Sequence, residues 1–190
     1  MKNLVYVRGQ IGTGKTMFMQ KLIHKAVKSS VPVYGFLQPC FYQEKTRTKY
    51  DVVSYANDKI IRLPFASLVD KVDKDGWIWN FNQKSIEDTR RFFDNIEIIQ
   101  KPSILVIDEF GRLESKGKGH WNSIYTLIRK LTESKIHFSP VITCRKQTHQ
   151  LLRDTLSKNF GFRKENMLIQ LPVDIEKEND YINQIVCKIK

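Results

Sequence analysis

Apolar residues along this chain alternate between short continuous runs and longer stretches with helical spacing. The run from Leu4 to Val7 is wholly apolar and ends at Arg8, a pattern typical of a short buried strand. Beyond Thr16, apolar side chains recur every three or four positions with polar ones opposite, which predicts an amphipathic helix. The chain therefore begins with a strand, a glycine-containing loop and a helix, whose apolar face consists of Phe18, Met19, Leu22, Ile23, Ala26 and Val27.

The same alternation continues to the end of the chain. Further strands are predicted at residues 31–37, 103–107, 138–144 and 167–171. Helices are predicted at residues 85–99, 121–131, 147–157 and about 178–189, the first of them with Ser85 as its N-cap. Strands that alternate with helices predict an α/β fold with a mainly parallel sheet, helices on both of its faces and ligands at the carboxyl ends of its strands.

An insertion interrupts this alternation after the second strand. Two short apolar segments flank Ala56, Asn57 and Asp58, which predicts a small β-hairpin insertion at about residues 45–65. A turn at Asp75-Gly76 is expected to precede one more short strand. No internal repeat or linker divides the chain, so we expect a single domain over residues 1–190.

The first glycine-containing loop carries the residues of a phosphate-binding site. It matches G-x-x-x-x-G-K-[ST] at every fixed position. Glycines let the backbone wrap inward so that its N–H groups point at phosphate oxygens, and the following helix adds the positive end of its dipole. We expect Lys15 to reach the β- and γ-phosphates and the Thr16 hydroxyl to bind Mg²⁺. The predicted nucleotide-binding residues are Gly9, Gln10, Ile11, Gly12, Thr13, Gly14, Lys15 and Thr16.

Two adjacent carboxylates follow a later apolar strand. The run from Ile104 to Ile107 leads directly into Asp108 and Glu109, as in the partner motif of phosphate-loop proteins, where a central strand delivers an acid beside the loop. We expect Asp108 to hold Mg²⁺ through its water shell. Glu109 is expected to orient or deprotonate a water molecule for attack on the γ-phosphate. The adjacent pair favours hydrolysis.

Three other features are candidates for contact with the γ-phosphate. Residues 111–119, which include Arg112, form a glycine-rich basic loop that either closes over the nucleotide or remains solvated. Arg145 follows the apolar strand that ends at Cys144, and it is either a surface residue or a group that neutralises transition-state charge within the chain. Arg47, in the basic stretch 44–49, is a further candidate for the same role.

The composition of the chain bears on its binding partners, its metal sites and its location in the cell. Lys and Arg outnumber Asp and Glu by 32 to 20, a net charge of +12 that attracts polyanions such as nucleic acid, although no nucleic-acid-binding motif accompanies it. The three cysteines form no C-x-x-C pair and the four histidines are scattered, so neither disulfides nor a structural metal site is predicted. No apolar run approaches the length of a membrane span, and we expect a cytoplasmic protein. The sequence carries no signal for base preference or oligomeric state.

Together these motifs resemble the small P-loop nucleoside-triphosphatase family, also described as nucleotide phosphatases or nucleotide kinases. Residues 107–114 (IDEFGRLE) are similar to its D-E-x-G-x-h-E signature, where h is apolar and the last glutamate is Glu114. Residues 34–36 and 47–53 resemble its second-strand glycine and its R-x-G-[FY]-x-h-h segment, with Lys49 in place of the glycine. The resemblance implies a Rossmann-like P-loop domain that hydrolyses ATP, GTP and other nucleoside triphosphates with Mg²⁺, using Lys15, Thr16, Asp108 and Glu109 in the roles given above.

Three functions are therefore compatible with the sequence. The first is a magnesium-dependent nucleoside triphosphatase, which the adjacent carboxylates favour. The second is a phosphotransferase acting on a nucleotide or small metabolite, with basic residues as its acceptor clamp. The third is a nucleotide-dependent module whose positive surface binds nucleic acid or a protein.

Overall fold

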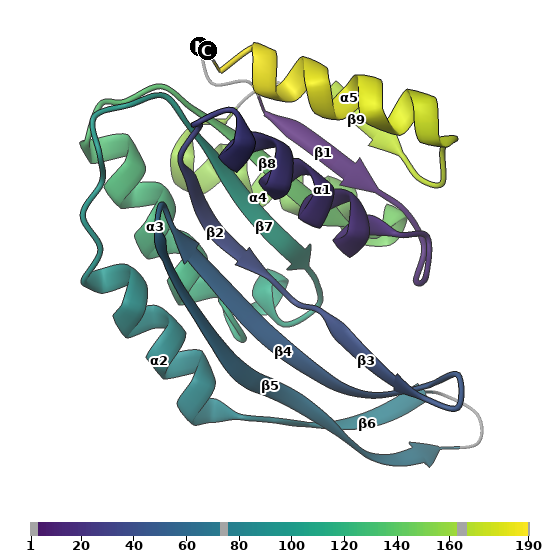
Figure 1. Ribbon diagram of the computed structural model, residues 1–190. Helices are drawn as coiled ribbons and strands as arrows, with labels where there is room; N and C mark the ends of the chain where they lie inside the picture. The colour runs from purple at the N-terminus through teal and green to yellow at the C-terminus, as the bar shows by residue number, and fades with distance from the viewer. Residues whose placement is uncertain (1–3, 73–75, 163–166, 190) are drawn as a thin grey trace.

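A nine-stranded sheet organises the computed structural model, which describes residues 4–72, 76–162 and 167–189 (Figure 1). Its strands are β1 (Val5–Arg8), β2 (Val33–Leu37), β3 (Cys40–Gln43), β4 (Thr46–Ala56), β5 (Lys59–Val72), β6 (Gly76–Phe81), β7 (Ser103–Phe110), β8 (Phe138–Cys144) and β9 (Met167–Gln170). The helices are α1 (Lys15–Lys28), α2 (Gln83–Asp94), α3 (Trp121–Glu133), α4 (His149–Phe160) and α5 (Ile175–Cys187). Two short 3₁₀ turns, η1 (Glu114–Lys116) and η2 (Lys146–Thr148), follow β7 and β8.

The central part of the sheet is parallel. Across the sheet the strands follow the order β6-β5-β4-β2-β7-β8-β1-β9, and β3 pairs with β4. The pairs β2·β7, β7·β8, β8·β1 and β1·β9 all run parallel. The predicted α/β fold with a mainly parallel central sheet is therefore confirmed. The carboxyl ends of these strands lie at one edge of the sheet, and the loop after β1 leads from that edge into α1 (Figure 1).

Helices cover both faces of the parallel strands because these strands are apolar on both sides. Successive strand residues point to opposite faces, so Val5 and Val7 of β1 pack with α1 and α5, whereas Tyr6 packs with α2, α3 and α4. The residues of β7 alternate between the same two cores. Figure 1 shows the two helix layers on opposite sides of the sheet.

The insertion is present but larger than predicted. Strands β4 and β5 pair across the expected turn at Asn57 and Asp58, yet β5 continues to Val72 and β3 and β6 add further antiparallel pairs. We call these four strands, residues 40–81, the antiparallel extension. Exposed positions interrupt the apolar runs of these strands, so a search for continuous apolar runs underestimates their length. Of the predicted turn at Asp75-Gly76, Asp75 lies outside the described residues, and the expected short strand is β6.

Helix ends differ from the sequence predictions where side chains cap the backbone. The cap of α2 is Asn82, whose side chain accepts a hydrogen bond from the Ser85 N–H at 3.1 Å, so the prediction of Ser85 as N-cap is wrong. This helix ends at Asp94 rather than at Ile99. Its C-cap is Asn95, whose side chain donates a hydrogen bond to the Arg91 carbonyl. Helix α5 begins earlier than predicted, after the N-cap Asp174. Within the described part of the chain, no helix combines the length and hydrophobicity needed to cross a membrane.

We expect Gly35→Ala to destabilise the protein strongly, because β2 and β7 approach each other too closely for a side chain. Gly35 has a φ of 124°, and a Cβ there would lie 1.8 Å from the Val106 carbonyl oxygen. The expected loss in the free energy of unfolding is roughly 4 kcal/mol or more. Gly161→Ala is the matched control, because Gly161 has a φ of 69° but no atom within 4 Å of its added Cβ. Left-handed backbone alone costs about 1–2 kcal/mol, so equal losses in denaturant unfolding would contradict the steric argument.

Candidate active site

The loop between β1 and α1 has the backbone geometry of a phosphate cradle. Gly12 and Gly14 adopt φ values of 83° and 88°, which other residues rarely adopt. Gly14 is the N-cap of α1, and the first turn of this helix carries no acidic side chain. The N–H groups at the start of α1 therefore face an anion site with no carboxylate of their own turn to compete for it.

Lys15 folds back over this loop. Its ammonium donates hydrogen bonds to the carbonyl oxygens of Gly9 at 3.1 Å and Gln10 at 2.9 Å. The side chain is buried, and burial lowers its pKa, while the carboxylates of Glu109 and Asp108 act in the opposite direction. The cation is thus already held at the loop, where phosphate oxygens would be stronger partners than neutral carbonyls.

Asp108 is the point at which several elements meet. It lies near the end of β7 and is 1% exposed. Its Oδ1 accepts a hydrogen bond from the Thr143 hydroxyl of β8 at 2.8 Å, and its Oδ2 accepts one from the Gln38 N–H after β2 at 3.2 Å. Burial raises the pKa of Asp108 to about 6, while the hydrogen bonds from Thr143, Gln38 and the Thr16 hydroxyl hold it down. The structure thus brings together Thr16 and Asp108, the two predicted magnesium ligands.

Glu109 points to a different partner. Its carboxylate accepts a hydrogen bond from Arg145 Nε at 2.7 Å and forms an ion pair with it. Both side chains are partly exposed, at 29% for Glu109 and 40% for Arg145. Arg145 directly follows β8, so two adjacent parallel strands place this pair at the carboxyl edge. The side chain that the sequence suggested as a phosphate contact therefore holds the predicted water-activating carboxylate.

The glycine-rich loop after β7 is ordered by a buried glutamate. Glu114 is 5% exposed, and its carboxylate accepts backbone N–H bonds from Gly111 and His120, both at 3.1 Å. Burial raises the pKa of Glu114. His120 packs against the rings of Phe36 and Phe65, and burial lowers its pKa to about 4, so it is neutral at physiological pH. The last glutamate of the signature thus fixes this loop, while Arg112 points to solvent.

Arg47 is brought to the phosphate loop from the antiparallel extension. Its Nη2 lies 3.8 Å from the position that a Cβ on Gly12 would occupy. Its Nε and Nη1 donate to the hydroxyls of Tyr42 at 3.1 Å and Tyr50 at 3.3 Å. The sequence motifs assign no role to the Thr143, Tyr42 and Tyr50 hydroxyls. The Thr143 contact depends on the pairing of β7 with β8, and the tyrosine contacts depend on how the β3–β4 hairpin folds around Arg47.

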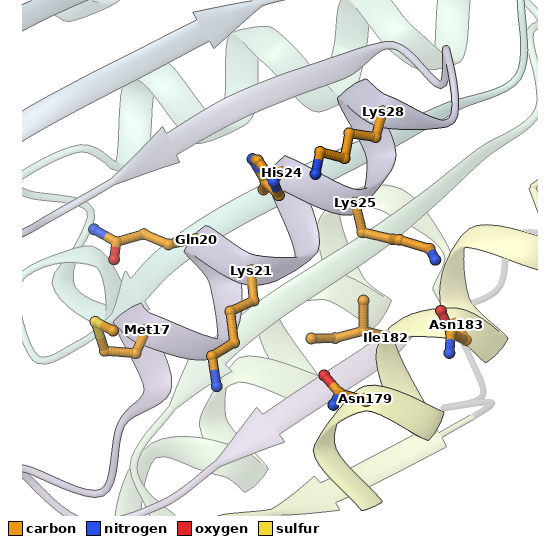
Figure 2. Close-up of a pocket in the computed structure, with 9 residues that line it drawn as sticks. All are labelled: Met17, Gln20, Lys21, His24, Lys25, Lys28, Asn179, Ile182 and Asn183. Atoms are coloured by element: carbon orange, nitrogen blue, oxygen red, sulfur yellow. The ribbon is translucent and has the colours of Figure 1, made fainter. Parts of the chain in front are cut away.

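The groove in Figure 2 is separate from this site. It lies between α1 and α5 and is lined mainly by exposed basic and amide side chains. Lys21 in this groove forms an ion pair with Glu178 at 2.6 Å. None of residues 9–16, the predicted nucleotide-binding residues, lines this groove.

A parallel sheet with a phosphate loop after β1 and a buried acid on β7 defines the class of P-loop nucleoside triphosphatases. The chain matches the NTPase family over residues 4–186 and belongs to that family, as its motifs predicted. It is accordingly a nucleoside triphosphate hydrolase. Among solved structures it is similar to the "Solution Structure of a Human Cancer-Related Nucleoside Triphosphatase", with a TM-score of 0.60 and 19% identity over 99% of this chain and 97% of that one. A comparison with curated proteins found no match.

We expect Asp108→Asn to stabilise the protein at pH 8 in buffer free of nucleotide and metal. The folded-state pKa of about 6 exceeds the ordinary value of about 3.9, so the unfolded chain loses this proton first and the stability of the folded protein falls as pH rises from about 4 to about 6. A neutral amide avoids this loss, and the expected gain is roughly 1–3 kcal/mol at pH 8. The gain should vanish below about pH 4, where both side chains are neutral. Denaturant unfolding at both pH values measures it, and a gain independent of pH would contradict the buried-charge explanation.

Proposed function

We propose that this chain is a magnesium-dependent nucleoside triphosphatase that transfers the γ-phosphoryl group of ATP- or GTP-type nucleotides to water. The proposal is carried by one observation: the two adjacent carboxylates at the edge of the sheet have different surroundings. Asp108 is buried beside Thr16, whereas Glu109 is partly exposed and held by Arg145. Two adjacent acids in such different surroundings are suited to different tasks.

The donor set at the loop is compatible with Mg²⁺. A hydroxyl and a carboxylate are the oxygen ligands that this ion prefers, and it commonly takes only one or two protein ligands together with phosphate oxygens and water. Thr16 and Asp108 are the residues that would hold it, as their shared hydrogen bond supports. When bound, the ion would neutralise charge on the terminal phosphates.

The remaining roles follow from the contacts of each side chain. The loop N–H groups and Lys15 bind the phosphates, with Lys15 exchanging its two carbonyl partners for phosphate oxygens. Glu109 accepts a proton from the water that attacks the γ-phosphorus, and the bond to the leaving diphosphate oxygen breaks. Arg145 acts as a positioning residue, because its contact with Glu109 fixes the direction of the carboxylate.

Glu109→Gln tests this proposal most simply. Glutamine keeps the shape of the side chain but cannot take the proton, so we expect kcat for phosphate release to fall by at least about 100-fold. Binding of a non-hydrolysable triphosphate with Mg²⁺, measured by calorimetry, should change by less than about threefold, because Glu109 is assigned no phosphate contact. Glu133→Gln is the matched control, since its side chain at the end of α3 is 63% exposed.

Three results would contradict the proposal. Wild-type turnover in Glu109→Gln would remove Glu109 as the water-activating group. Nucleoside diphosphate formation that depends on an added nucleoside or monophosphate acceptor would instead indicate a phosphotransferase. Phosphate release that persists with excess EDTA would contradict the magnesium assignment.

A further inference from the structure

The antiparallel extension carries one arginine to the phosphate loop. Strands β3 and β4 form a hairpin whose turn residues, Glu44 and Lys45, have φ values of 49° and 72°. Directly after this turn, Arg47 pairs with Tyr42 across the two strands. Figure 1 shows this hairpin extending past the carboxyl end of β7. Residues of the antiparallel extension thereby reach the phosphate loop.

Two tyrosines hold the Arg47 guanidinium in a defined orientation. Nε donates to the Tyr42 hydroxyl at 3.1 Å, and Nη1 donates to the Tyr50 hydroxyl at 3.3 Å. The Tyr42 ring centroid lies 5.7 Å from Cζ, and the Tyr50 ring packs edge-on against Trp79 at 4.9 Å. The nitrogen that neither tyrosine engages, Nη2, is the one beside Gly12.

The charge of Arg47 is uncompensated in the described part of the chain. By contrast, Arg145 at the site pairs with Glu109, and Arg62 in the extension pairs with Asp51. The described residues place no carboxylate within ion-pair distance of Arg47. Its tyrosine partner Tyr50 cannot replace one, because burial raises the pKa of that phenol to about 12 and keeps it neutral. A half-buried, oriented cation beside a phosphate cradle favours binding of an anion there.

We propose that Arg47 contacts the terminal phosphate oxygens of the bound triphosphate and neutralises the negative charge that develops on them, and that the hydroxyls of Tyr42 and Tyr50 position its guanidinium. The antiparallel extension then completes the catalytic site within one chain. The proposal rests on the proposed function only in taking a nucleoside triphosphate as the ligand. The cation that stabilises the transferring phosphoryl group is thus Arg47 of the extension, since Arg145 is already engaged by Glu109.

Arg47→Ala should lower kcat for phosphate release by about 100- to 1,000-fold, the range in which arginine contacts to a transferring phosphoryl group act. Arg47→Lys should restore less than about a tenth of the lost rate, because a single ammonium cannot keep both tyrosine contacts and the phosphate contact. Arg62→Ala is the matched control, as Arg62 lies on the neighbouring strand β5 of the same extension and pairs with Asp51. Its kcat should stay within about twofold of wild type.

Tyr50→Phe tests the positioning role. Loss of the hydroxyl alone should lower kcat by about tenfold, and the double variant Arg47→Ala with Tyr50→Phe should be no slower than Arg47→Ala, because both changes act through one guanidinium. Multiplicative losses in the double variant would overturn the positioning role. Wild-type kcat in Arg47→Ala would overturn the phosphate contact.

Binding separates failure of this inference from failure of the proposed hydrolysis. Arg47→Ala should weaken binding of a non-hydrolysable nucleoside triphosphate by at least about tenfold more than binding of the monophosphate. This measurement needs no turnover. It therefore tests the phosphate contact of Arg47 even if the wild-type protein transfers phosphate to an acceptor other than water. Equal weakening of both nucleotides would overturn the inference and leave the hydrolase assignment standing.

Discussion

The buried carboxylate of Asp108 is the interaction on which the arrangement of the site depends. A carboxylate that is 1% exposed requires hydrogen bonds, and its partners come from three other elements: Thr143 from β8, Gln38 from the end of β2 and Thr16 from α1. These elements are far apart in sequence but adjacent at the carboxyl edge of the parallel sheet. One acidic group thereby fixes the phosphate loop against the strands, at an electrostatic cost that a bound cation would offset.

The parallel part of the fold was predictable because each central strand is buried on both faces. Continuous apolar runs such as the one ending at Val7 mark such strands directly, and the phosphate loop lies at the boundary between strand and helix. The full antiparallel extension was not predictable in the same way, because its strands mix exposed and buried positions. The cap of α2 was misplaced because Ser85 and Asn82 both have cap-forming side chains, and only the geometry distinguishes them.

The site was predictable as far as motifs extend. Short sequence motifs contain Lys15, Thr16, Asp108 and Glu109, so these residues could be found from the sequence alone. The partners of Arg145 and Arg47 depend instead on strand order and register. Arg145 reaches Glu109 because β7 and β8 are neighbours. Arg47 reaches Gly12 because the extension projects past the carboxyl edge. The surroundings of the loop and of Glu109 therefore depend on both the parallel sheet and its insertion, which net charge alone does not indicate.

A crystal structure with a non-hydrolysable nucleoside triphosphate and Mg²⁺ tests the account most directly. We expect Lys15 to leave the carbonyl oxygens of Gly9 and Gln10 for the phosphates, the ion to lie between Thr16 and Asp108, and Arg47 Nη2 to contact a terminal phosphate oxygen. A nucleotide bound in the groove between α1 and α5, with Lys15 still donating to the two carbonyls, would contradict it.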